Sequence, residues 1–119
     1  MGRHRLSVGR RGEQQVAGWY LERGYEVVAR NWRCAQGEID LLCRRIESAR
    51  GKTLVVCEVK TRTTDAFGHA LEAVPPRKQQ RIRRVTAAFL RSQSARYEHV
   101  RFDVAAVSGG NVSVVEDAF

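Results

Sequence analysis

Two carboxylates and a lysine fall inside two apolar, strand-like segments of the sequence. Asp40 lies in GEIDLLCRRI, residues 37–46, and Glu58 and Lys60 lie in KTLVVCEVKTR, residues 52–62. Side chains alternate along a strand, so Glu58 and Lys60 share one face. The turn near ESARGK joins the segments as a hairpin, which places Asp40 on the neighbouring strand. We therefore expect the three side chains to converge at one end of two adjacent strands.

Such a cluster suits a hard divalent cation. Two carboxylates held close together repel each other, and one must take a proton unless a cation lies between them. Mg²⁺ and Mn²⁺ prefer oxygen ligands, and Mg²⁺ is usually held by only one or two carboxylates. We expect Asp40 and Glu58 to hold Mg²⁺ or Mn²⁺, with the backbone carbonyl of Val59 as a further ligand. Lys60 would orient a water or stabilise a pentavalent phosphate.

The same residues also have a purely structural interpretation. A Glu-x-Lys triplet is common by chance, and it fits a solvent-facing strand with a Glu–Lys ion pair and an Asp in a turn. However, the strand that contains Glu58 is too apolar to be a simple solvent edge. Ionisable residues are rarely buried in such strands unless they are paired or bind something, which favours a site.

Two further charged residues fall on the core-facing stripes of predicted helices. Glu13 precedes Val16 and Ala17 by three and four residues, and Lys78 precedes Ile82 by four. Both side chains could therefore lie on the core side of their helices. Glu13 could equally be a first-turn residue that offsets the helix dipole, and Lys78 could be a lysine whose ammonium reaches solvent at a helix start.

The outward face of the second predicted helix is basic, and the whole chain shares this bias. Lysine and arginine outnumber aspartate and glutamate by 21 to 13, which gives a net charge of +8. A basic run usually means a solvated face, but it also suits a polyanion such as nucleic acid. The candidates for phosphate contacts are Arg62, Arg77, Lys78, Arg81 and Arg84, with Arg44 and Arg45 as further members.

Hydrophobic periodicity and turn residues predict the elements that position these side chains. In chain order we predict a helix over 10–23, strands over 25–31, 37–46 and 52–62, a helix over 77–93, and strands over 98–107 and 111–116. Residues 63–76 are loop-like, and Pro75 and Pro76 fit the first turn of the second helix. The pattern indicates a mixed α/β domain with helices packed on a central sheet.

The bulk composition sets limits on the class of protein. With 119 residues and 43% apolar residues, the chain fits one globular domain, which we expect over residues 9–119 after a flexible basic tail at 1–8. The three cysteines form no CxxC pair, which argues against zinc and favours free thiols, with Cys43 and Cys57 in the core. No apolar run is long enough to span a membrane, and we expect a cytoplasmic location.

The motifs together resemble a known family. The segments GEQQVAGWYLERGYEVVARNWRC, GEIDLLCR, LVVCEVKTR, ALEAVPPRKQQRIRRVTAAFL and VRFDVAAV are similar to the small bacterial YraN-like family of predicted endonucleases. That family is similar to archaeal Holliday-junction resolvases and belongs to the PD-(D/E)xK superfamily. The resemblance implies the restriction-endonuclease-like fold, with Asp40 and Glu58 as metal ligands, Lys60 as the catalytic lysine and Glu13 as an assisting carboxylate. Ile39 stands where the superfamily pattern has proline.

The residues and the resemblance lead to one main functional hypothesis and one alternative. The first is a Mg²⁺- or Mn²⁺-dependent endonuclease acting on DNA, and branched DNA is suggested by analogy with junction resolvases. One small domain covers little duplex, so a homodimer that cuts two strands fits this analogy. The alternative is a non-catalytic nucleic-acid-binding module of the same fold. A membrane partner is not expected, because the basic helix has no broad apolar face free of core packing.

Overall fold

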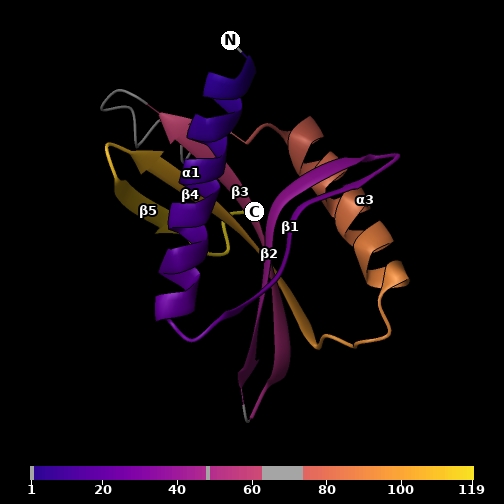
Figure 1. Cartoon of the computed structure of the whole chain (residues 1–119). Coiled ribbons are helices and arrows are strands. Elements are labelled where there is room, and N and C mark those ends of the chain that lie inside the picture. Colours follow the sequence, from indigo (N-terminus) through magenta and orange to yellow (C-terminus); the bar gives the residue numbers. More distant parts are fainter. Residues whose placement is uncertain (1, 48, 63–73) are drawn as a thin grey trace.

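The structure is a computed structural model that describes residues 2–47, 49–62 and 74–119, with the side chains of residues 10–47, 49–61 and 74–119. A five-stranded mixed sheet lies between two helices (Figure 1). In chain order the elements are α1 (Gly2–Glu22), β1 (Glu26–Cys34), β2 (Gly37–Glu47), β3 (Gly51–Arg62), α3 (Pro76–Ser92), β4 (His99–Ser108) and β5 (Asn111–Val115). The predicted α/β order, α-β-β-β-α-β-β, is confirmed.

The strands lie side by side in the order in which the chain makes them. Neighbouring strands are antiparallel except for β3 and β4, which pair in parallel. A parallel pair needs a crossover connection, and the segment that contains α3 supplies it. The β2–β3 hairpin predicted from the turn near residue 50 is present, with Leu41 opposite Cys57 and Glu47 opposite Gly51.

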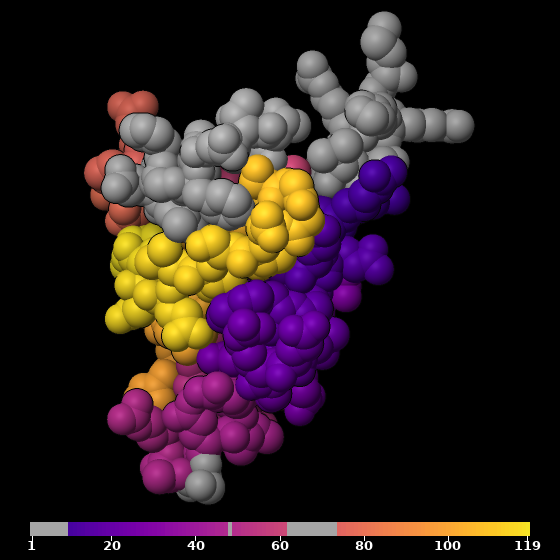
Figure 2. Space-filling model, turned by 90° about the vertical axis from the view of Figure 1, so that its left-hand side faces the viewer, coloured from indigo at the N-terminus to yellow at the C-terminus, as the bar shows by residue number. Residues whose placement is uncertain are grey.

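The two helices cover opposite faces of the sheet because the strand side chains alternate. On one face, Val16 and Tyr20 of α1 pack with Leu41 of β2. On the other face, Val85 of α3 packs with Leu42. These strands read as nearly continuous apolar runs because both of their faces are buried. The space-filling view shows α1 lying beside the C-terminal strands (Figure 2).

A buried carboxylate ties α1 to the sheet. Asp103 of β4 is fully buried and accepts hydrogen bonds from the Tyr20 hydroxyl at 2.6 Å and from the guanidinium of Arg101 at 2.9 Å. The backbone N–H of Asp117 donates to the same carboxylate at 3.0 Å. Arg101 and Asp103 share one face of β4, which allows this ion pair to form within the strand. Each carboxylate oxygen is satisfied, so this buried charge stabilises the packing of α1 on β4.

The first helix begins earlier than the sequence pattern predicts. α1 starts at Gly2 rather than near residue 10, so its first two turns cover the segment that we expected to be a flexible tail. This segment contains no proline, and its arginines and leucine favour helix, which makes continuation of the helix physically reasonable. Consequently Glu13 lies in the middle of a 21-residue helix, and no acidic residue occupies the first turn. The interpretation of Glu13 as a residue that offsets the helix dipole is therefore wrong, because that effect is confined to the end turns.

The other boundaries agree closely with prediction, with one instructive difference. Pro75 caps α3 and Pro76 begins it, as expected. β1 was predicted to end at Asn31 but continues to Cys34. Asn31 has a positive φ of 50°, a conformation that asparagine adopts more readily than most residues, and the strand continues through it. Trp32 then packs edge-on against Phe89 of α3.

The cysteines and the loop before α3 complete the comparison. Cys34, Cys43 and Cys57 are free thiols, and Cys43 and Cys57 are buried as expected. Burial raises the pKa of Cys43 to about 12, so this thiol stays protonated and behaves as a small apolar side chain. The predicted loop spans residues 63–76, and its residues 63–73 lie outside the part of the chain that the structure describes. No helix in the described part of the chain is both long and apolar enough to cross a bilayer.

Candidate functional site

The β2–β3 hairpin brings Asp40 and Glu58 to neighbouring positions at one end of the sheet. Leu41 pairs with Cys57, and Asp40 and Glu58 are the next residues along the two strands. The backbone N–H of Val59 donates a hydrogen bond of 2.8 Å to Asp40 Oδ2. This bond directs the Asp40 side chain toward β3. The Val59 carbonyl, which we expected to bind metal, is on the same residue, and its role stays a prediction.

Glu58 and Lys60 lie on the face of β3 that α3 covers. They follow Val56, which packs in the core beneath α3, at alternate positions of the strand. Both side chains are largely shielded: that of Glu58 is 13% exposed, and Lys60 is 9% exposed as a whole residue. Lys78 Nζ, from the first turn of α3, lies 2.6 Å from Glu58 Oε1. The expectation that Lys78 lies on the core side of its helix therefore agrees with its position.

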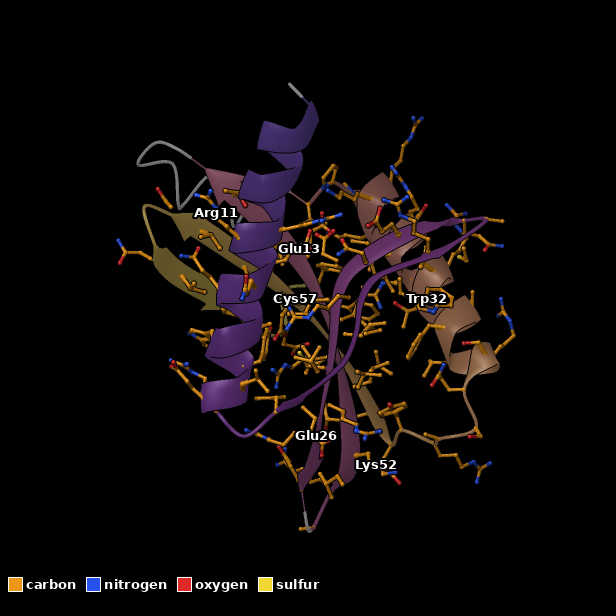
Figure 3. The ribbon with its side chains drawn as sticks, viewed as in Figure 1. Arg11, Glu13, Glu26, Trp32, Lys52 and Cys57 are labelled. Atoms are coloured by element: carbon orange, nitrogen blue, oxygen red, sulfur yellow. The ribbon has the colours of Figure 1, made fainter. Side chains whose placement is uncertain are left out.

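Glu13 lies on α1, which packs closely on the opposite face of β3, and its negative charge acts on Asp40. At Gly12 the helix approaches Thr61, and a methyl group in place of the glycine hydrogen would overlap Thr61 Oγ1. The close approach places the next residue, Glu13, between α1 and the sheet (Figure 3). The side chain of Asn31 hydrogen-bonds to Glu13, so this residue of β1 helps to hold the carboxylate.

The carboxylates perturb one another. Burial is the main cause that raises the pKa of Asp40 to about 7, and the negative charges of Glu58, Glu13 and Glu38 raise it further. The Val59 N–H opposes this effect. Burial also raises the pKa of Glu13, again with a contribution from Glu38. The raised pKa of Asp40 means that its negative charge is poorly stabilised, and a bound cation would stabilise it.

The electrostatics identify Glu38 as a fourth carboxylate that the sequence reasoning missed. Glu38 pairs with Arg33 across β1 and β2, with Nε 3.2 Å from Oε2, and its side chain is 34% exposed. It raises the pKa of both Asp40 and Glu13. The available signal was its position two residues before Asp40 in GEID.

The arginines predicted to contact phosphate divide into two groups. Arg77, Arg81 and Arg84 are exposed on α3, and Arg81 lies against Gly37 at the start of β2. The side chain of Arg62 lies outside the described residues. Arg44 and Arg45, by contrast, pair with Glu26 at 3.0 Å and Glu47 at 2.5 Å, toward the other end of the hairpin. Their predicted contact with phosphate stays a prediction, although each of these two arginines already has a carboxylate partner.

The donor set fits an open Mg²⁺ or Mn²⁺ site better than a closed cage. Asp40 and Glu58 offer two carboxylates, the number that Mg²⁺ commonly takes while it keeps several waters. Among the residues that the structure describes, no group of three or more His, Cys, Asp or Glu side chains is arranged to hold a metal ion. Asp40 and Glu58 would therefore be the two carboxylates of such an open site.

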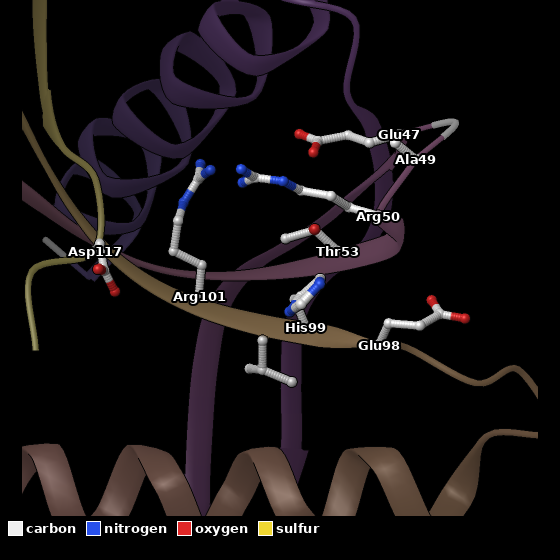
Figure 4. Close-up of a pocket in the computed structure, with 9 residues that line it drawn as sticks. Glu47, Ala49, Arg50, Thr53, Glu98, His99, Arg101 and Asp117 are labelled. Atoms are coloured by element: carbon white, nitrogen blue, oxygen red, sulfur yellow. The ribbon is translucent and has the colours of Figure 1, made fainter.

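A separate pocket of about 660 Å³ lies at the other end of the sheet (Figure 4). It is lined by Arg50 of the β2–β3 turn, by His99 and Arg101 at the start of β4, and by Glu47 and Asp117. Figure 4 shows the Arg50 and Arg101 side chains pointing toward each other across it. None of the predicted site residues lines this pocket. The pocket is lined by both acidic and basic side chains, so it lacks the excess of negative charge that the carboxylate cluster has.

The fold and the cluster define a small α/β protein with shielded carboxylates and a lysine at one end of its sheet. Comparison with known proteins gives the family. The uncharacterised protein family UPF0102 matches residues 12–107. Similar UPF0102 proteins include one from Beutenbergia cavernae, 46% identical over 101 residues (85% of this chain and 81% of the relative), and one from Rhodococcus opacus, 40% identical over 121 residues (98% of each).

A third similar UPF0102 protein, from Mycolicibacterium gilvum, is 44% identical over 106 residues, covering 89% of this chain and 84% of the relative. The chain belongs to the UPF0102 family, which is the YraN-like family that its motifs resemble. All the proposed site residues from Glu13 to Arg84 fall within the matched region. Since the family is uncharacterised, membership shows a relationship to these proteins, and any function has to be argued from the site residues.

Proposed function

We propose that this protein is a divalent-metal-dependent phosphodiesterase that cuts DNA, acting as an endonuclease in the cytoplasm in DNA repair or recombination. The observation that carries the proposal is the meeting of shielded carboxylates beside Lys60. Burial raises the pKa of Asp40 of β2 to about 7, and the negative charges of Glu58 from β3 and Glu13 from α1 add to this effect. A fold gains no stability from such repulsion, and burial of like charge is a feature of functional sites.

Each residue has a role that its position supports. Asp40 and Glu58 would hold Mg²⁺ or Mn²⁺, and the cation would neutralise charge on the phosphate. Lys60, on the same strand face as Glu58, would stabilise the extra negative charge as water attacks phosphorus. Glu13 would accept a proton from that water, for which a raised pKa is suitable.

The exposed basic face of α3 would hold the substrate. Arg77, Arg81 and Arg84 are exposed on the helix whose Lys78 pairs with Glu58. They would contact backbone phosphates, which position a nucleic acid without reading its sequence. A two-fold dimer would place two such sites on the two strands of a duplex or a branched DNA. These contacts predict binding that weakens steeply with salt.

The test is a cleavage assay on linear, nicked, single-stranded and four-way-junction DNA in Mg²⁺ and in Mn²⁺. Asp40→Asn protein prepared in parallel controls for contaminating nucleases. We expect metal-dependent cleavage by the wild-type protein and none by the variant. Cleavage that is equal in both preparations, or absent on every substrate with both metals, would contradict the proposal.

The ion pair between Lys78 and Glu58 favours a second candidate, a nucleic-acid-binding module without catalysis. In that case Lys78 would serve permanently as the cation of the site, and no metal would be needed. DNA affinity measured with and without Mg²⁺ separates the two functions. A pure binder would be insensitive to Mg²⁺ and would bind more tightly after Asp40→Ala, because a repulsive charge is removed.

A further inference from the structure

Lys78 occupies a position that the helix itself disfavours. It lies in the first turn of α3, next to Arg77 and with no acidic residue in that turn. The helix dipole places partial positive charge at this end, so a cation here is unfavourable. The compensating contact is the 2.6 Å ion pair with Glu58. The placement of Lys78 is therefore explained by the carboxylate that it neutralises and not by the helix that carries it.

The ion pair also joins a shielded side chain to a more exposed one. The Glu58 side chain is 13% exposed, whereas the Lys78 side chain is 36% exposed. The four-carbon stem of lysine is flexible and its ammonium is strongly hydrated. Lys78 can thus leave for solvent at little cost, but Glu58 cannot follow, and its charge would then need another partner.

We propose that Lys78 is the resident counter-ion of the metal-free site, and that a divalent cation must displace it from Glu58 in order to bind. This inference rests on the proposed function. An ammonium at hydrogen-bond distance from Glu58 Oε1 and a divalent cation on the same carboxylate repel each other. The two cations are therefore competitors for Glu58. Metal binding to Glu58 would release the Lys78 side chain at the start of α3.

The exchange has a consequence for substrate binding. While Lys78 is paired with Glu58, its charge is not available to a phosphate. Once displaced, the ammonium lies at the end of α3 that also carries Arg77 and Arg81, where a phosphate would meet it. Lys78 should therefore contribute to DNA affinity in the presence of a divalent cation and contribute little in its absence.

Calorimetric titration of Mn²⁺ into metal-free protein tests the competition directly, without any activity measurement. Lys78→Met removes the ammonium but keeps the length of the side chain, and Lys78→Gln is a second variant in case the first folds poorly. Lys52→Met is the matched control, because Lys52 lies at the opposite end of β3 from the carboxylates (Figure 3). Circular dichroism confirms that each variant is folded.

We expect Lys78→Met and Lys78→Gln to bind Mn²⁺ about tenfold more tightly than the wild-type protein, and Lys52→Met to bind it equally. Metal-free Lys78 variants should also melt at lower temperature than the wild type. Unchanged or weaker Mn²⁺ binding by both Lys78 variants would overturn the inference and leave the proposed function intact. Lack of Mn²⁺ binding by every protein would overturn both, whereas tight binding without DNA cleavage would overturn only the proposed function.

Discussion

Replacing Asp40 by asparagine should make the metal-free protein more stable at neutral and alkaline pH. Asparagine is uncharged and has nearly the same shape, and its side-chain oxygen can still accept the Val59 N–H bond that measures 2.8 Å. What it removes is a negative charge held among Glu58, Glu13 and Glu38. Substitution of Asp40, a proposed metal ligand, would thus increase the stability of the fold while removing the proposed activity.

The size of the effect follows from the pKa of Asp40. Its ordinary value is 3.8, and in the folded protein it is raised to about 7. Folding therefore favours the protonated carboxyl, and the resulting stability is complete below pH 3.8 and is lost as the pH rises through 7. A difference of about three pKa units corresponds to at most about 4 kcal/mol. We expect Asp40→Asn to exceed the wild type by about 2–4 kcal/mol at pH 8 and to equal it at pH 4.

The assay is urea unfolding with a chelator at pH 4 and at pH 8, followed by circular dichroism. Glu22→Gln is the control, because the Glu22 side chain is 81% exposed and its removal should change stability little at either pH. Adding Mg²⁺ at pH 8 should stabilise the wild type and leave Asp40→Asn unchanged, which narrows the difference between them. The reasoning is refuted if Asp40→Asn is no more stable than the wild type at pH 8, or if its advantage is the same at pH 4.

Three further substitutions test other parts of the structure. Gly12→Ala should destabilise the protein by about 1–3 kcal/mol in urea unfolding, since the added methyl group overlaps Thr61 of β3. Its control, Gly18→Ala, has open space around it and should be neutral or stabilising by up to about 1 kcal/mol. Equal effects of the two substitutions would contradict the close packing of α1 on β3. Lys60→Met should abolish DNA cleavage at unchanged DNA affinity, and normal turnover would remove Lys60 from the mechanism. Tyr20→Phe should cost about 1–2 kcal/mol, because Asp103 loses the 2.6 Å hydrogen bond but keeps its other donors; a loss below about 0.3 kcal/mol would refute that accounting.

Much of the sheet was predictable because its strands carry strong local signals. The apolar runs around Asp40 and Glu58, joined by a short turn, specify a hairpin and hence the proximity of the two carboxylates. Alternation along β3 likewise puts Glu58 and Lys60 on one face. The prolines before α3 mark its start within one residue. These features depend on nearby residues, so sequence reasoning reaches them.

The features that escaped prediction depend on contacts between distant residues. The apolar stripe of α1 that includes Val16 and Tyr20 was recognised, but residues 2–9 contain few apolar residues and two glycines, so the start at Gly2 was missed. Glu38 looks like an ordinary strand residue until α1 brings Glu13 near it. Arg44 belongs to a basic sequence run, but pairing with Glu26 on β1 neutralises it. In each case the deciding partner lies on another element.

The parallel pairing of β3 with β4 affects how the chain reaches its final form. This pairing joins Thr53 to His99 and Lys60 to Ala106, so it can form only after the whole α3 segment has been made and has crossed the sheet. Closing such a long loop is slower than zipping the β2–β3 hairpin. A growing chain on the ribosome would therefore hold Asp40 and Glu58 side by side well before Lys78 arrives, and the early hairpin carries its two acidic groups without the lysine that later balances them.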